Sequence, residues 1–169
     1  MKTQHIIYYV EGEDEEKLVN TLKSDLFLIK SGKVQRLNVI EQKISRARLI
    51  NMRANTIVVL VFDTDTGNTD ILNENIKVLK ACSTVLQIIT IPQVLNLEDE
   101  LVRSCAIRRI KDLLGSRSNG DFKKDLIKVT NLSAKLQKNN FDINEFWSSI
   151  PNAPYQCVEN MAHIIKIGQ

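Results

Sequence analysis

Short apolar stretches alternate with amphipathic ones along the first half of the chain. Four runs are rich in the β-branched and aromatic residues that favour strands. The strands expected from them span residues 5–10, 32–39, 56–62 and 84–90. The segments between these runs place apolar residues at helical spacing. The helices expected there span residues 13–23, 40–52 and 69–82.

This β-α-β-α-β-α-β order predicts an α/β fold, with a mostly parallel four-stranded sheet flanked by helices. After Pro92 the pattern becomes helical and more charged, and we expect helices over residues 97–115 and 122–139. We therefore expect an α/β core over residues 1–100 and a helical C-terminal extension over residues 101–169, packed on the same domain. A length of 169 residues with 43% hydrophobic content is consistent with one compact domain.

Composition argues against several classes of protein. Cys82, Cys105 and Cys157 are odd in number and lack the spacing of a zinc site or a disulfide framework. The apolar run over residues 5–10 is too short for a signal peptide or a membrane span, so we expect a cytoplasmic protein without a membrane partner. The formal net charge of +3 is too small to indicate nucleic acid by itself.

Carboxylates follow three of the expected strands, directly after the first and the third and a few residues after the fourth. Ligands of open α/β sheets bind at the carboxyl ends of the strands, where such side chains would gather. The sequence "VEGED" ends the first strand, "VFDTD" ends the third, and "NLEDEL" follows the fourth. Asp63 and Asp65 would point to the same side if the strand continued. Grouped carboxylate oxygens suit Mg²⁺ or Mn²⁺ and not zinc.

A structural explanation competes with this one at the first helix. Acidic residues at positions 13–16 suit the first turn of a helix, where the helix dipole favours negative charge. Asp63 does not fit that explanation, because it follows a strongly apolar run and a half-buried carboxylate is costly without a cation. Asp63 and Asp65 therefore favour a metal site.

The sequence "IIYYVEGEDEEKL", followed later by "VVLVFDTDTGN", resembles the toprim domain found in topoisomerases, bacterial primases and OLD-family nucleases. The signature of that family is a hydrophobic strand ending in Glu-Gly and a later one ending in Asp-x-Asp. The resemblance covers roughly residues 4–100. It implies a toprim-like, Rossmann-like fold, with Glu11, Asp63 and Asp65 as catalytic metal ligands.

The pattern is closest to that of the OLD-like nucleases, which implies further site residues. An additional acid would be Glu15, and a later acidic pair would be Glu98 and Glu100. A lysine near the end of the domain would be Lys123 or Lys124, with Lys123 as the catalytic candidate. The resemblance thus implies a nuclease that cleaves phosphodiester bonds with Mg²⁺ or Mn²⁺.

The chain also differs from several of the toprim proteins that it resembles. It has no P-loop, so an ATPase would have to be a separate chain, as in two-gene phage-defence systems. One alternative is a toprim module that binds metal, nucleic acid or a partner without cleaving. A second alternative is an aspartate-nucleophile phosphatase, whose motif is Asp-x-Asp-x-Thr after the first strand. The "DTDTG" motif fits less well, because it has Gly67 in place of the threonine and follows the third strand.

A nuclease needs cations near its carboxylates, because the carboxylates repel a polyanion. DNA is favoured over RNA as the nucleic-acid partner. The nucleic-acid-binding candidates are Arg46, Arg48, Arg108, Arg109, Arg117 and Lys124.

Overall fold

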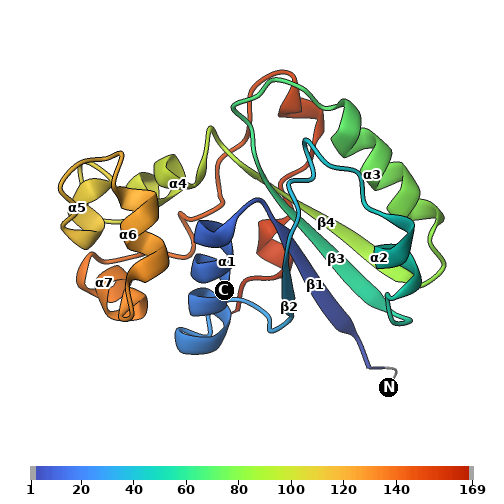
Figure 1. Ribbon diagram of the computed structural model, residues 1–169, viewed down its shortest axis with the longest axis horizontal. Helices are drawn as coiled ribbons and strands as arrows, with labels where there is room; N and C mark the ends of the chain where they lie inside the picture. The colour runs from blue at the N-terminus through green and yellow to red at the C-terminus, as the bar shows by residue number, and fades with distance from the viewer. Residues whose placement is uncertain (1–2, 168–169) are drawn as a thin grey trace.

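The computed structural model describes residues 3–167, which form one four-stranded sheet with helices on both faces (Figure 1). The strands are β1 (His5–Val10), β2 (Lys33–Arg36), β3 (Thr56–Asp63) and β4 (Val85–Gln93). Their order across the sheet is β2-β1-β3-β4, and every neighbouring pair is parallel. The predicted α/β fold with a four-stranded sheet is confirmed, and the sheet is wholly parallel.

Strand β3 lies at the centre of the sheet, and all eight of its residues are buried. Its alternate side chains enter two different cores, because successive residues of a strand face opposite sides of the sheet. Val59 and Val61 belong to one core, and Leu60 and Phe62 belong to the other. Burial on both faces explains why this strand is a continuous apolar run.

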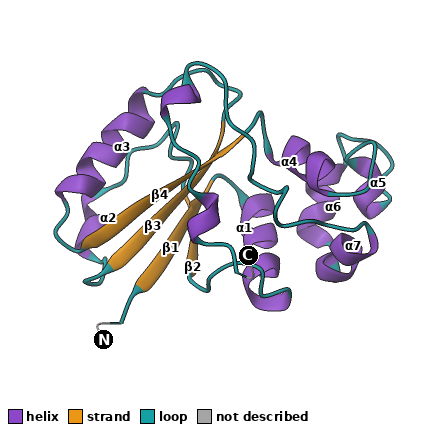
Figure 2. Cartoon of the chain, turned by 180° about the vertical axis from the view of Figure 1, so that it is seen from behind, coloured by secondary structure: helices purple, strands orange, loops and turns teal. Residues whose placement is uncertain are grey.

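The helices divide unequally between the two faces (Figure 2). One face carries α1, η1, α4, α5, α6, α7 and η3, whose apolar side chains share a core with Tyr8 and Val10 of β1. The bounds are α1 (Glu13–Asn20), η1 (Thr21–Asp25), α4 (Leu97–Ser104), α5 (Lys111–Leu114), α6 (Phe122–Lys128), α7 (Leu132–Lys138) and η3 (Ala162–Ile164). The other face carries α2 (Arg46–Ile50), α3 (Asp70–Ala81) and η2 (Tyr155–Cys157).

The predicted helix over residues 40–52 is wrong in its first half. Only Arg46–Ile50 is helical, and residues 40–45 form a loop. The buried side chain of Asn75 holds this loop, since it accepts the Ile44 N–H (2.8 Å) and donates to the Val39 and Gln42 carbonyls (3.0 and 2.9 Å). These bonds satisfy backbone groups that a helix would otherwise pair internally.

The two long C-terminal helices expected from the sequence are each interrupted. The first breaks over residues 105–110, where the Ala106 N–H donates to the Asn139 carbonyl (2.7 Å). The second breaks over residues 129–131 into α6 and α7. No helix within residues 3–167 combines the length and apolarity that crossing a bilayer requires.

Candidate functional site

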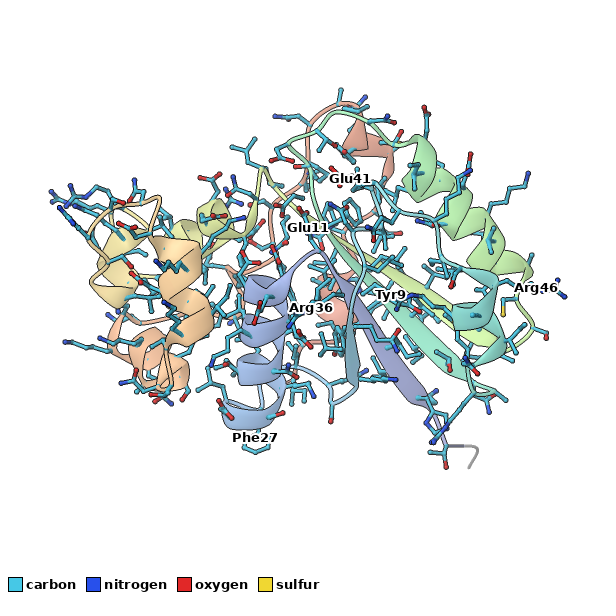
Figure 3. All side chains as sticks on the ribbon, viewed as in Figure 1. Tyr9, Glu11, Phe27, Arg36, Glu41 and Arg46 are labelled. Carbon is cyan, nitrogen blue, oxygen red and sulfur yellow. The ribbon has the colours of Figure 1, made fainter. Side chains whose placement is uncertain are left out.

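The strand order creates a topological switch point at the carboxyl ends of β1 and β3, and we call the space between the diverging connections the crevice. The chain leaves β1 through α1 on one face and leaves β3 through α3 on the other, so the connections diverge between these adjacent strands. Such a point is where open α/β sheets bind ligands. Glu11 follows β1 and Asp63 ends β3, and both therefore lie at this crevice. Figure 3 shows Glu11 beyond the carboxyl end of β1.

Six carboxylates and one lysine gather around the crevice. We call the carboxylates the acidic cluster, which consists of Glu11, Asp14, Glu15, Asp63, Asp65 and Glu98. Helix α6 adds Lys123, whose Nζ lies 3.5 Å from Asp14 Oδ2 and 3.6 Å from Glu98 Oε1. The site thus combines segments after β1, after β3, at the start of α4 and in α6.

Burial and mutual repulsion make two of these carboxyls weak acids. Burial, followed by the charges of Glu11 and Asp65, raises the pKa of Asp63 to about 8. Burial, a hydrogen bond with Asp14 and the charges of Asp14 and Asp63 raise the pKa of Glu15 to about 9. Asp63 is only 7% exposed and Glu15 only 3%. Without a bound cation, both groups therefore favour their protonated forms near neutral pH.

Glu11 reaches solvent, yet its pKa is also raised. Partial burial is the main cause, and the charges of Asp65, Glu41 and Asp14 add to it. Lys123 opposes this rise. Burial by itself would lower the pKa of Lys123, but the surrounding carboxylates, Asp14 and Glu98 foremost, outweigh burial and raise it. Lys123 is therefore a firmly charged ammonium that partly neutralises the cluster.

A buried amide fixes the orientation of Asp63. With the amide of Gln93 in the orientation that satisfies both of its neighbours, its nitrogen donates to Asp63 Oδ1 (3.0 Å). Its oxygen accepts the indole N–H of Trp147 (3.3 Å). Gln93 pairs with Asp63 in the register of β3 and β4, and both are buried. The C-terminal segment thereby reaches the candidate site through Trp147.

A second contact from the C-terminal segment holds the loop that carries Asp65. The buried ring of Tyr155 packs against Phe62, and its hydroxyl lies 2.9 Å from Thr66 Oγ1. The same hydroxyl donates to the Asn68 carbonyl (2.9 Å). Tyr155 therefore stabilises the chain directly after the Asp-x-Asp sequence.

Gly12 allows the close approach of two carboxylates at the start of α1. Its N–H donates to Glu15 Oε2 (2.9 Å), as in a capping box. A Cβ atom at this position would lie 2.9 Å from Asp14 Oδ1 and 3.2 Å from Glu15 Oε2. The glycine is therefore needed for space, since its backbone is in the ordinary extended region.

Replacing Gly12 with alanine is expected to lower the free energy of unfolding by about 1 kcal/mol, because the added methyl group displaces buried carboxylates. Chemical denaturation measures this change. Gly120→Ala is the matched control, because the nearest side-chain atom to its Cβ would be 3.7 Å away. Equal stability of the two variants would contradict a tight fit at Gly12.

The acidic cluster suits a divalent cation in its donor chemistry. All six members offer hard carboxylate oxygens, which Mg²⁺ and Mn²⁺ prefer. Two of these oxygens, Asp14 Oδ2 and Glu98 Oε2, are buried without a hydrogen-bond partner in the described chain. Over residues 3–167, however, no three His, Cys, Asp or Glu side chains converge closely enough to form a ready metal site. Cation binding would therefore require the carboxylates to move toward a common point, with Asp14 and Glu98 turning from Lys123.

No protein-family model, curated protein or solved structure matches the chain.

The structure brings together most of the carboxylates predicted from the sequence, but it turns Glu100 away. Glu100 is completely buried, and its oxygens accept the N–H groups of Val94 (2.9 Å) and Trp147 (3.0 Å). Arg103 lies 2.8 Å from the same carboxylate. Glu100 thus supports the fold beside the site and is not a member of the acidic cluster.

The predicted nucleic-acid-binding residues do not form one surface. Arg46 and Arg48 lie on α2, on the sheet face opposite to α6, and Figure 3 shows Arg46 far from Glu11. The other four predicted residues are exposed on the α6 side: Arg108, Arg109, Arg117 and Lys124. Among these, Arg109 already pairs with Asp112 (3.4 Å). Lys124 follows Lys123 and is the predicted cation nearest in sequence to the cluster.

Sequence reasoning missed Asp14 and Gln93. Asp14 fits the first turn of α1, where the helix dipole favours a carboxylate, and its contact with Lys123 places it in the cluster. Gln93 carried no sequence signal, because its role depends on the pairing of β4 with β3.

Proposed function

We propose that this protein is a metal-dependent phosphodiesterase that cleaves nucleic acid, with a toprim-like fold and an OLD-like site. One observation carries the proposal: six carboxylates from three separate segments, with a lysine, lie around the crevice between β1 and β3. The raised pKa values of Asp63 and Glu15 support it. Crowded, half-buried carboxylates are costly without cations, and Lys123 supplies only one positive charge for six of them.

In this proposal Glu11, Asp63 and Asp65 hold Mg²⁺ or Mn²⁺, and Glu15 and Glu98 complete the site. The bound metal would polarise the scissile phosphate and supply hydroxide near neutral pH. Gln93 keeps the Asp63 carboxylate directed into the crevice.

Lys123 has a distinct role in this account. Its ammonium now contacts Asp14 and Glu98, and it would turn to the phosphate once the carboxylates bind metal. There it would neutralise the negative charge that develops as the bond to the leaving oxygen breaks. Its raised pKa keeps it charged throughout the neutral range.

The substrate proposed is DNA in preference to RNA, in the cytoplasm. The exposed cations around α5 and α6 would contact the phosphate backbone, with Lys124 beside the catalytic lysine. A separate ATPase protein, as in two-gene phage-defence systems, is the protein partner we propose.

Supercoiled plasmid and structured RNA, incubated with the protein in Mg²⁺, Mn²⁺ or EDTA, test this function. We expect metal-dependent nicking by the wild type and a loss of at least about 100-fold in Glu11→Gln and Asp63→Asn, because each removes a ligand charge. Asp25→Asn is the matched control, since Asp25 is exposed on η1 and forms no ion pair in the described chain. Cleavage that persists in EDTA, or equally in Asp63→Asn, would contradict the proposal.

One observation favours a second function, that of a toprim module that binds without cleaving. Lys123 already contacts two of the carboxylates, which partly neutralises the cluster in the absence of metal. Binding of DNA or of an ATPase that is independent of metal and unchanged in Glu11→Gln would favour this module over the nuclease.

A further inference from the structure

A cavity lies on the face of the sheet that carries α2 and α3, and none of its lining residues belongs to the acidic cluster. This cavity of about 740 Å³ opens over β1 and β2 beside α2. It exists because α2 is only five residues long and leaves this part of the sheet uncovered. Its volume falls within the roughly 300–1,000 Å³ that is typical of small-molecule sites. Figure 3 shows Tyr9, which lines the cavity, between the sheet and α2.

The charge of the cavity wall is entirely positive. Lys33, Arg48 and Arg53 line it, and none of its lining residues is an aspartate or a glutamate. In the described part of the chain these three cations form no ion pair, whereas Arg36 and Lys43 nearby both do. The cavity therefore concentrates cationic groups that no carboxylate of residues 3–167 neutralises.

Arg48, one of the lining residues, is held in place by three contacts. Its guanidinium donates to Gln35 Oε1 (2.8 Å) and to the Arg36 carbonyl (3.3 Å). It also lies over the ring of Tyr9, 5.6 Å from the ring centre. A guanidinium that is already ordered loses less entropy when it binds an anion, and its planar donors match phosphate oxygens.

The remaining walls suit an organic group. Ile7 and Met52 provide apolar surface, and Gln4, Asn51 and Thr56 provide neutral hydrogen-bonding groups. A bare inorganic anion would leave most of this volume unused. A ligand that carries phosphate on an organic body would contact both kinds of wall.

From this juxtaposition we propose that the cavity binds a phosphate-bearing organic molecule of nucleotide size, with Lys33, Arg48 and Arg53 contacting the phosphate. The site shares no residue with the acidic cluster and lies on the face that carries α2 and α3. Binding there is independent of the proposed nuclease function.

Isothermal titration with ATP, pyrophosphate and adenosine tests this proposal. The titrations are done in EDTA, so that metal at the acidic cluster cannot hold phosphate. We expect ATP to bind and Lys33→Gln/Arg53→Gln to weaken its binding at least about tenfold, because charge-assisted hydrogen bonds are lost. Lys77→Gln/Lys80→Gln, with the same change in net charge on the exposed side of α3, is expected to bind ATP like the wild type.

Several results would overturn the proposal. One is the absence of ATP binding up to millimolar concentration in a protein with a normal melting transition. Another is equal weakening in the two double variants, which would indicate a general charge effect. Pyrophosphate binding as tightly as ATP would contradict the organic part of the ligand, and adenosine binding as tightly would contradict the phosphate part. Retention of ATP binding in Asp63→Asn would separate this site from the acidic cluster and support the proposal.

Discussion

Replacing Glu100 with glutamine is expected to lower the free energy of unfolding by about 3 kcal/mol, because it breaks a buried charge network. The carboxylate of Glu100 is fully buried and accepts two backbone N–H groups, from Val94 and Trp147. A glutamine side chain has one acceptor oxygen, so one N–H would face an amide donor. Arg103 would also lose its carboxylate partner. Urea denaturation at pH 7 measures the change.

Glu98→Gln is the matched control for this prediction. Glu98 lies two residues earlier on α4, is partly exposed, and has a buried oxygen without a hydrogen-bond partner in residues 3–167. Its replacement should change stability by less than about 1 kcal/mol. If Glu100 were instead a metal ligand, Glu100→Gln would fold normally and lose metal binding, a result that would contradict the structural role assigned to it.

Asp63→Asn is expected to stabilise the metal-free protein by at least about 2 kcal/mol at pH 8. The pKa of Asp63 is about 8 in the folded protein and near 3.8 in an unfolded chain. Between these values the folded state holds a proton that the unfolded state has lost, so stability falls as pH rises from about 4 to about 8. Each pKa unit between the folded and unfolded states corresponds to about 1.4 kcal/mol of stability. A third of the rise in the pKa of Asp63 is therefore enough for a gain of about 2 kcal/mol.

Asparagine carries no charge, so Asp63→Asn removes the cost of ionising a buried carboxyl. Its side-chain oxygen can still accept the hydrogen bond from the Gln93 amide. Thermal unfolding in EDTA from pH 4 to pH 9 should show the wild type losing stability and Asp63→Asn losing less. The two proteins should be nearly equal in stability at pH 4. Adding Mg²⁺ at pH 8 should raise the melting temperature of the wild type alone. A variant that is less stable than the wild type at pH 8 would contradict the account.

The strands could be predicted because their signal is local. A continuous apolar run such as residues 56–62 has few structural alternatives, and all four observed strands begin within one residue of the expected start and end within three of the expected end. The loop at residues 40–45 could not be predicted, because it depends on Asn75, more than 30 residues later in the chain. Apolar spacing places Ile40 and Ile44 in the core whether the segment is helical or not.

The candidate site was predictable to the extent that it follows strand ends. Glu11, Asp63 and Asp65 each follow the end of an apolar run, so their positions at strand ends could be predicted. They lie near one another because β1 and β3 are neighbours in the sheet. Glu98 and Glu100 follow the same strand, and the contacts of Glu100 with Val94, Trp147 and Arg103 distinguish the buried one from the cluster member. Asp14 and Gln93 acquire their roles from tertiary contacts, which periodicity does not record.

Repulsion within the acidic cluster gives the site its physical character. Burial and like charge raise the pKa values of Asp63 and Glu15, so the metal-free protein stores unfavourable free energy at the crevice. Lys123 relieves part of it from α6, and Gln93 prevents Asp63 from turning away. A divalent cation would relieve the remainder, which links folding stability to metal binding.

Mn²⁺ binding, measured by electron paramagnetic resonance of the free ion, tests the central claim most directly. At pH 7.5 we expect the wild type to bind at least one Mn²⁺ per chain, with competition by Mg²⁺. Asp63→Asn should lose this binding, and Asp25→Asn should retain it. Wild-type protein that binds no Mn²⁺, or that binds it equally well when Asp63 is replaced, would contradict a metal site at the crevice between β1 and β3.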